Sequence, residues 1–258
     1  MGSDSSRGDG VAGRKRGPKP RTDVRQRADK LVRQAGIPTH YAFLVARGEM
    51  TLNEALQKMA LKDKVESLIG RHDLPRSLAT QVAMGQADLD RVLQKRRLES
   101  HLEKWREHSS LATAVEHGRP MLLSLHDKRW CTGTVRSVDR YEVVLDTDDG
   151  EQTVHKLQVK LAVEAAHARD LRRAVKRDKG RDAPTEPIWK PQDRYGCSDK
   201  RLFGYFDEAT PIQVTTLEGD VIVGTVAWMG RWEFGLTLKK SNAPVTVFRH
   251  ALADLRSA

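Results

Sequence analysis

The sequence predicts a multidomain α+β protein, in which an N-terminal all-α domain of repeated helices precedes two small antiparallel β-barrels, each with a short helix before it. Three observations lead to this fold class. Residues 211–255 contain short runs of β-branched and aromatic residues separated by glycine, asparagine and proline. A related pattern occurs 91 residues earlier, and residues 24–107 have helical periodicity and repeat internally. Short runs between turn residues are typical of small barrels.

Five segments follow from these patterns. They are a disordered basic tail over 1–22, a helical domain over 23–107, a first barrel over 108–164, a basic helix and proline-containing linker over 165–197, and a second barrel over 198–258.

The composition favours a polyanionic partner and a reducing compartment. The formal net charge is +10, which favours polyanions such as nucleic acid. Two cysteines give no disulfide framework. We recognise neither a signal peptide nor an apolar run long enough to span a bilayer. We therefore expect a cytoplasmic protein that does not bind membranes.

The N-terminal tail consists almost entirely of glycine, serine, proline and basic residues, so we expect it to be disordered. Its segment Arg14–Pro20 loosely resembles an AT-hook, which binds the DNA minor groove, but it lacks the second basic residue of that motif's core. The alternative is a solvated tail that adds non-specific affinity for phosphates, including those of DNA.

The helical domain is predicted to contain two copies of one unit, a short helix, a glycine turn and a longer helix, 37 residues apart. The identical pairs are Pro38/Pro75, Ala42/Ala79, Val45/Val82, Ala46/Ala83, Gly48/Gly85, Leu52/Leu89, Leu56/Leu93, Gln57/Gln94 and Lys58/Lys95. In each unit the proline suits the start of the short helix and the glycine suits its end. Thr51–Glu54 is a capping box, and Asp88 can cap the counterpart helix. The stripe of Leu52, Leu56 and Met59, and the matching stripe of Leu89, Val92 and Leu93, predict a core between the two units.

A short helix, a turn and a longer helix also match a DNA-binding helix-turn-helix motif. The predicted helix 89–106 is rich in lysine and arginine, but it also carries several glutamates. We therefore prefer a helical interaction domain and keep DNA binding as the alternative.

The two barrels are predicted from an internal repeat. Pro120, Gly133, Thr134, Val135, Arg140, Glu142 and Leu145 recur 91 positions later as Pro211, Gly224, Thr225, Val226, Arg231, Glu233 and Leu236. After the third strand the offset becomes 93. Gly224 lies inside the second run, where a glycine marks a bend or a close approach of two backbones.

Helical segments are expected around the barrels. Ser109–Gly118 and Ser198–Asp207 each begin with a serine that can cap a short helix. Leu161–Lys179 is expected to be a helix that leaves the first barrel, and its cations are Arg169, Arg172, Arg173, Lys176 and Arg177. Residues 181–191 contain three prolines and are predicted to be a linker.

The stretch 211–255 resembles the Sm-like family, and within it the bacterial Hfq-like RNA chaperones. The resemblance rests on the spacing of Pro211 and Gly224, on Gly219, and on the run Val247–Ala251. It implies small, strongly bent barrels whose unpaired strand edges pair between chains to form rings. With two barrels per chain, it implies a homo-oligomer, either a trimer that forms a pseudo-hexameric ring or a hexamer.

The resemblance also implies an RNA-binding site, in which an aromatic ring stacks a base while a Lys-His pair reaches the base edge and a phosphate. By position, these roles fall to Arg231, Trp232, Arg249 and His250 in the second copy, and to Arg140, Tyr141 and Lys156 in the first. In the first copy Leu157 stands where the histidine is expected. The alternatives are that the two aromatic residues belong to the barrel cores and that His250 is a hydrogen-bonded structural histidine. The repeated basic residues favour binding, because a core does not need them.

We find no phosphate-binding loop, no nucleophile elbow and no metal-ligand spacing, and we predict no enzymatic activity, metal or cofactor. The predicted function is binding of single-stranded RNA, with U-rich RNA as the first candidate, as an RNA chaperone or post-transcriptional regulator. The alternative is a DNA-binding or nucleoid-associated regulator that uses the helical domain and the tail, with the barrels as its oligomerisation core. A scaffold that binds proteins is the third possibility.

Overall fold

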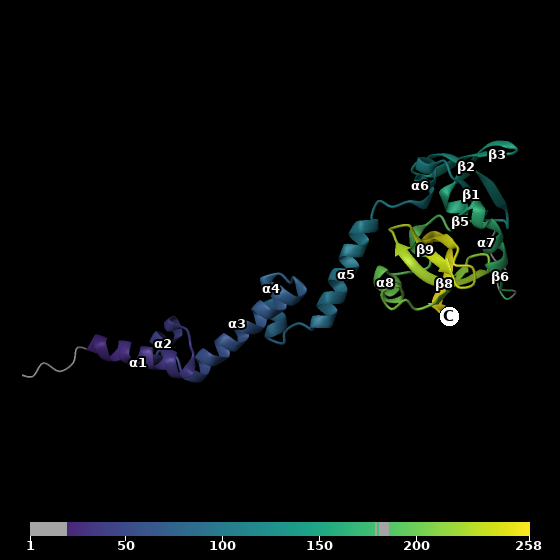
Figure 1. Cartoon of the computed structure of the whole chain (residues 1–258). Helices are drawn as coiled ribbons and strands as arrows, with labels where there is room; N and C mark the ends of the chain where they lie inside the picture. Colours follow the sequence, from purple (N-terminus) through teal and green to yellow (C-terminus); the bar gives the residue numbers. More distant parts are fainter. Residues whose placement is uncertain (1–19, 179, 181–185) are drawn as a thin grey trace, which may run out of the picture. The chain divides into compact units, whose positions relative to one another are not determined.

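The structure, a computed structural model, describes residues 20–178, 180 and 186–258. The chain forms two compact units, one up to Leu93 and one from Gln94 onward (Figure 1). Residues 1–19 of the predicted tail, with most of the AT-hook-like segment, lie outside the described residues, whereas residues 20–22 begin the first helix.

The first unit is helical, and the predicted repeat is confirmed. Its elements are α1 (Pro20–Ala35), α2 (Thr39–Ala46), α3 (Leu52–His72), α4 (Arg76–Ala83) and the beginning of α5 (Leu89–Trp105). Helix α4 follows α2, and the start of α5 follows the start of α3, with the same offset of 37 residues that the sequence shows. Gly48 and Gly85 end the two short helices with φ angles of 78° and 72°, a region that favours glycine.

The two longer helices have the predicted N-terminal caps. The Glu54 N–H donates to Thr51 Oγ1 over 3.2 Å, and the Thr51 N–H donates to Glu54 Oε2 over 2.8 Å. The Arg91 N–H donates to Asp88 Oδ1 over 2.9 Å. These bonds satisfy amide groups that have no partner within their own helix.

The prediction for the stripe of Leu52, Leu56 and Met59 is wrong, because helix α3 is long enough for its two ends to join different cores. The second stripe, of Leu89, Val92 and Leu93, does pack against a core that combines the end of α3 with α4. The first core gathers α1, α2 and the start of α3, and its buried residues are Ala28, Ile37, Ala42 and Ala55. The second gathers the end of α3, α4 and the start of α5, and its buried residues are Val65, Leu68, Leu74, Ala79 and Val82. Leu52 and Leu56 of the predicted stripe are exposed, while Met59 packs against the first core.

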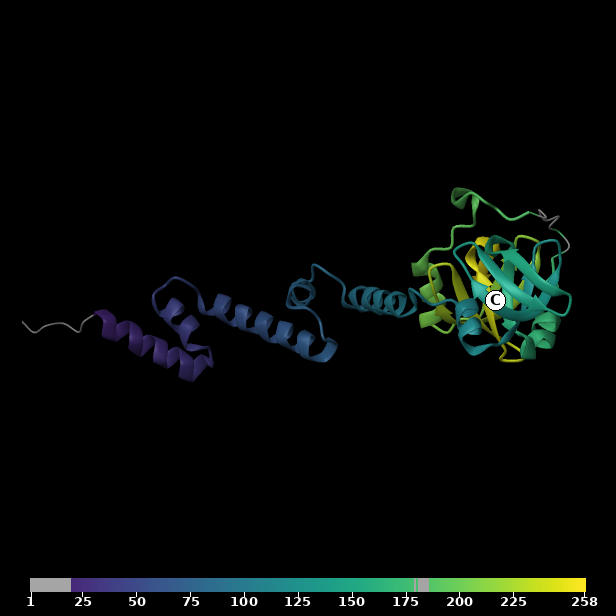
Figure 2. The same cartoon turned by 90° about the horizontal axis from the view of Figure 1, so that it is seen from above.

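The second unit contains the strands. Its α-helices are the rest of α5, α6 (Ser110–His117), α7 (Ala168–Ala174) and α8 (Asp199–Asp207). Its strands are β1 (Pro120–Leu125), β2 (Trp130–Val138), β3 (Glu142–Thr147), β4 (Gly150–His155), β5 (Val159–Glu164), β6 (Lys176–Arg177), β7 (Ile212–Thr216), β8 (Asp220–Met229), β9 (Glu233–Leu238), β10 (Pro244–Phe248) and β11 (Leu252–Ser257). As predicted, Ser109 and Ser198 cap α6 and α8. Helix α6 lies against β2 and helix α8 against β8 (Figures 1 and 2).

The prediction of two separate barrels is wrong. Within the described residues the strands form one antiparallel sheet of eleven strands, in the order β11-β7-β8-β9-β10-β5-β1-β2-β3-β4 with β6 beside β8, and this sheet is not closed. The join lies between β10 and β5, where Thr246 pairs with Ala162 and Val247 with Leu161. The edge strand of a sheet leaves backbone N–H and C=O groups unpaired. Because β10 and β5 pair with each other, each half of the sheet satisfies one such edge of the other half.

The hydrophobic cores also cross this join. Leu122, Leu161 and Val163 of the first half belong to the core of the second half, and Phe248 of the second half belongs to the core of the first. The two halves therefore do not fold around independent cores.

The internal repeat itself is present in register. We call β1–β5 the first repeat and β7–β11 the second. The pair Val135 and Leu145 in β2 and β3 corresponds to the pair Val226 and Leu236 in β8 and β9, and a bulge follows each pair. The predicted close approach at Gly224 is confirmed, because a Cβ atom there would lie 2.4 Å from the carbonyl oxygen of Thr237.

The helix predicted over Leu161–Lys179 is wrong. Strand β5 continues to Glu164, helix α7 is short, and β6 follows it and pairs with β8. The reason is that the apolar start of this segment pairs with β1 and is fully buried, so it is used as a strand. Of the predicted linker, residues 181–185 lie outside the described residues.

Candidate nucleic-acid interface

Two equivalent turns present exposed aromatic rings. We call Arg140–Tyr141, between β2 and β3, the Tyr141 turn, and Arg231–Trp232, between β8 and β9, the Trp232 turn. Tyr141 is 56% exposed and Trp232 is 64% exposed, so neither ring belongs to a core. The guanidinium carbon of Arg140 lies 5.1 Å from the Tyr141 ring centroid, and that of Arg231 lies 4.6 Å from the Trp232 centroid. Each turn therefore offers a flat ring and a cation together.

The backbone brings each turn to the basic residue that follows the fourth strand of its repeat. The Lys156 N–H donates to the Tyr141 carbonyl over 2.7 Å, and the Arg249 N–H donates to the Trp232 carbonyl over 2.9 Å. Both basic residues begin short 3-10 helices, η1 (Lys156–Gln158) and η4 (Arg249–Ala251). The structure thus brings the backbone of each aromatic turn next to the basic residue that the sequence assigned to the same site.

Arg249 and His250, however, have partners inside the protein. Arg249 Nη1 lies 2.6 Å from Asp199 Oδ1, while its Nε and Nη2 are buried and have no partner among the described residues. His250 donates from Nε2 to the Val159 carbonyl over 2.9 Å, which ties η4 to β5. Burial lowers the pKa of His250 to about 4, so the ring is neutral near pH 7. This geometry is the hydrogen-bonded structural histidine that the sequence left as an alternative.

The first repeat has two aromatic neighbours that the sequence analysis missed. The His155 ring lies 6.3 Å from the Tyr141 ring at an interplanar angle of 11°, and 5.0 Å from the ring of Trp189, which is 56% exposed. Burial lowers the pKa of Lys156 in the same region. His155 precedes Lys156 instead of following it, and Trp189 lies in the predicted linker, so no motif pointed to either residue.

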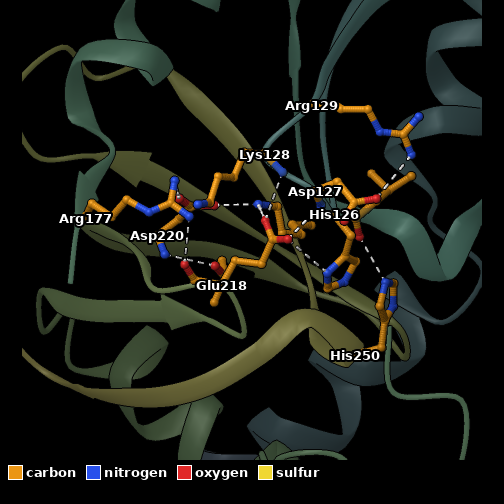
Figure 3. Close-up of polar contacts among 11 residues, drawn as sticks. His126, Asp127, Lys128, Arg129, Arg177, Glu218, Asp220 and His250 are labelled. Carbon is orange, nitrogen blue, oxygen red and sulfur yellow. Dashed lines mark hydrogen bonds and ion pairs between the residues drawn. The ribbon is translucent and has the colours of Figure 1, made fainter. Parts of the chain in front are cut away.

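A buried charge cluster, also missed, lies elsewhere on the sheet (Figure 3). Lys160 of β5 lies 2.5 Å from Glu218, in the turn between β7 and β8, and 2.6 Å from Asp220, the first residue of β8, and its side chain is 1% exposed. Glu218 also accepts from the N–H groups of Asp127 and Lys128 over 2.6 and 3.3 Å. Burial alone raises the pKa of Glu218, but Lys160 and the Asp127 N–H outweigh it, and the net shift is downward. We call Lys160, Glu218 and Asp220 the anchor cluster, because they join the two repeats.

Other kinds of site find no support in the part of the chain that the structure covers. Among these residues no group of three His, Cys, Asp or Glu side chains could hold a metal ion. No described helix combines the length and apolar composition that a bilayer crossing requires. Neither a model of a known protein family nor a curated protein sequence matches the chain. Function is therefore inferred from the geometry of the chain's own residues.

Proposed function

We propose that the protein binds single-stranded RNA at the Tyr141 and Trp232 turns and acts in the cytoplasm as an RNA chaperone or post-transcriptional regulator. The observation that carries this proposal is the exposed ring with a guanidinium above it, present at the same place in both repeats. Stacking of a base on an aromatic side chain stabilises a complex by roughly 1–3 kcal/mol per base. As part of the same proposal, we infer that the resemblance of residues 211–255 to the Sm-like family reflects a common mode of RNA binding.

Single strands suit these turns better than a duplex. A ring at the tip of a turn can stack only on a base that has left its own stack, which single strands and loops provide. The neighbouring arginines add phosphate contacts that do not depend on sequence, and the net charge of +10 favours the approach of any polyanion. The aromatic rings therefore account for the preference for single strands, and the positive charge accounts for the attraction of the RNA to the protein.

The open edges of the sheet support an assembly of several chains. Strands β4 and β11 end the strand order, and they are the repeat equivalents of β10 and β5, which pair within the chain. An equivalent pairing of β4 with β11 of another chain sets Thr153 opposite Leu255. In this arrangement three chains close a ring of six repeats and place several aromatic turns on one assembly, which strengthens binding of a long RNA through multivalency.

The proposal is tested by fluorescence anisotropy of the full chain with oligo-U, oligo-A and a mixed duplex DNA across a salt series. We expect binding of single-stranded RNA to persist at about 0.15 M salt while duplex binding is lost. Trp232→Ala and Tyr141→Ala should each weaken RNA binding by roughly 5- to 150-fold, the equivalent of one stacked base. Met84→Ala, which removes another exposed apolar side chain, is the control and should change nothing.

Either of two results would contradict this proposal and favour one of the alternative functions. If duplex DNA binds as tightly as RNA, and only changes of Arg91 and Lys95 on α5 to glutamate weaken it, the DNA-binding alternative holds. If no nucleic acid binds at about 0.15 M salt, the protein is better described as a scaffold.

A further inference from the structure

A pocket of about 380 Å³ lies beside the anchor cluster. Its wall includes Lys128, Trp130, Arg172, Lys176, Arg177 and Asp220. Strand β2 begins at Trp130 in this wall and ends at Val138, close in sequence to the Tyr141 turn. The pocket and that turn therefore belong to opposite ends of the same strand. The pocket volume falls within the range of small-molecule sites, roughly 300–1,000 Å³.

The anchor cluster leaves the floor of the pocket close to neutral. Lys160 is paired with both Glu218 and Asp220, and Arg177 donates to the Glu218 carbonyl over 3.3 Å and lies 4.0 Å from Asp220. Figure 3 shows Arg177, Asp220 and Glu218 next to one another. Two cations and two carboxylates thus compensate each other.

Three further cations around the pocket have no such compensation. Lys128, Arg172 and Lys176 are exposed, and none of them forms an ion pair within the part of the chain that the structure describes. Like charges held around one cavity repel each other, and an anion at the centre removes that repulsion. The excess positive charge therefore selects an anionic ligand.

The surrounding backbone holds this arrangement in place. Lys128 lies in a turn with φ of 61°, next to Asp127 with φ of 62°, and both N–H groups donate to Glu218 (Figure 3). Lys176 lies in β6, which pairs with Val221 of β8. The anchor cluster therefore holds the backbone at Lys128, and the sheet holds it at Lys176, so little backbone rearrangement is needed there when a ligand binds.

The wall is not purely ionic. Trp130 is half-buried, and the guanidinium carbon of Arg172 lies 5.6 Å from its ring centroid. Val175 adds an apolar side chain beside Lys176. A ligand that combines a phosphate with a flat ring matches both parts of such a wall.

We propose that this pocket binds a nucleoside monophosphate, with Lys128, Arg172 and Lys176 around the phosphate and Trp130 beside the base. The nucleotide can be free, or it can be the 5′-terminal nucleotide of an RNA. The proposal goes beyond RNA binding at the aromatic turns and does not depend on it, because the two regions share no residue.

Isothermal titration of the full chain with UMP, uridine and inorganic phosphate at about 0.15 M salt tests this pocket. We expect UMP to bind, uridine not to bind, and inorganic phosphate to compete with UMP. Arg172→Ala and Lys176→Ala should each weaken UMP binding at least about tenfold, since each removes a charged contact with the phosphate. Arg136→Ala and Lys240→Ala are the matched controls. Each removes one positive charge from an exposed residue outside the pocket, so UMP binding should be unchanged. The double variant Tyr141→Ala with Trp232→Ala should also bind UMP normally.

Oligo-U with a 5′-phosphate or a 5′-hydroxyl separates the two sources of the nucleotide. Tighter binding of the phosphorylated strand, lost in Lys176→Ala, assigns the pocket to RNA ends, whereas equal binding of the two strands assigns it to free nucleotides. The proposal is overturned if UMP does not bind, if uridine binds equally well, or if the control variants weaken UMP binding as much as Lys176→Ala does. Unfolding curves that match the unsubstituted protein show that the variants are folded.

Discussion

The ammonium group of Lys160 lies 2.5 Å from the carboxylate of Glu218, and this pair joins strand β5 of the first repeat to the β7–β8 turn of the second. Both side chains are at most 2% exposed. The same carboxylate accepts from the Asp127 N–H, so three segments of the chain meet at one buried group. Buried charges are tolerated only where such partners replace water.

Lys160→Met should destabilise the second unit by about 3–5 kcal/mol, because it leaves Glu218 and Asp220 buried without their cation. Urea unfolding monitored by tryptophan fluorescence measures this loss. Arg136→Met is the matched control: Arg136 lies 2.6 Å from Asp146, but both side chains are largely exposed, so the change should cost at most about 1 kcal/mol. Equal effects of the two substitutions would show that the anchor cluster contributes no more than a surface ion pair.

The features that the sequence predicted correctly depend on short segments or on the repeat. Thr51 and Glu54 are three residues apart, so their capping box is visible in the sequence. The aromatic turns follow from the repeat, because Tyr141 and Trp232 each come directly after an arginine at equivalent positions.

The features that it missed depend on contacts between distant segments. Lys160 and Glu218 are 58 residues apart, and a lysine next to Leu161 in a strand gives no sign that it is buried. The pairing of β10 with β5 could not be predicted for the same reason. The residues of each strand suit pairing within a separate barrel equally well, so they do not show which strand lies beside them. The partner of Arg249 is Asp199, which belongs to helix α8, so its burial could not be foreseen from the strand that precedes it.

Gly224→Ala and Gly133→Ala should each destabilise the sheet by about 1–3 kcal/mol, because the new Cβ must displace a backbone. It would lie 2.4 Å from the Thr237 carbonyl oxygen in one repeat and 2.5 Å from that of Asp146 in the other. Gly204→Ala in helix α8 is the control. Apart from its chain neighbours and the backbone of its own helix, no atom lies within 4 Å of its added Cβ, so helix propensity should make that variant more stable by about 0.5–1 kcal/mol. The urea midpoints of the three variants test this prediction. If Gly204→Ala lowers stability as much as Gly224→Ala does, the close backbone approach is not the cause of the destabilisation.

Glu233 and His250 should give stability opposite dependences on pH. Burial raises the pKa of Glu233 from 4.5 to about 7, so its contribution is complete below pH 4.5 and is lost as the pH rises through 7. Burial lowers the pKa of His250 from 6.5 to about 4, so its contribution is complete above pH 6.5 and is lost as the pH falls through 4. Each amounts to at most about 3 kcal/mol, and in the unsubstituted protein the two trends oppose each other.

Single substitutions separate these trends. Glu233→Gln should make stability rise with pH between 4.5 and 6.5, helped by His101, His108 and His126, whose pKa values burial also lowers. His250→Gln, which keeps a donor for the Val159 carbonyl, removes one of these rising contributions, so stability should rise less with pH over that range, or fall more, than in the unsubstituted protein. Glu142→Gln changes the exposed equivalent of Glu233 and serves as the control. Urea midpoints measured across this range test the prediction, and parallel profiles for all variants would refute it.

Thr153→Lys should prevent assembly without unfolding the chain. Thr153 is exposed on the edge strand β4, whereas its repeat equivalent Thr246 is buried by the neighbouring β5. If β4 pairs with β11 of another chain as β10 pairs with β5, a lysine at this position is buried without a partner. Light scattering should give about three times 29.1 kDa for the unsubstituted chain and 29.1 kDa for the variant.

The reverse change is also informative, because Asp254 of β11 stands where Leu161 stands in β5. In the proposed pairing Asp254 faces Val154, as Leu161 faces Val247 within the chain. Asp254→Leu should therefore create an apolar pair of the same kind between chains. The assembly should then dissociate only at lower protein concentration. A charged residue on an edge strand normally limits pairing with other chains. An unsubstituted chain that stays monomeric while Asp254→Leu assembles would show that this aspartate protects the edge, and a chain that stays monomeric in both forms would exclude the ring.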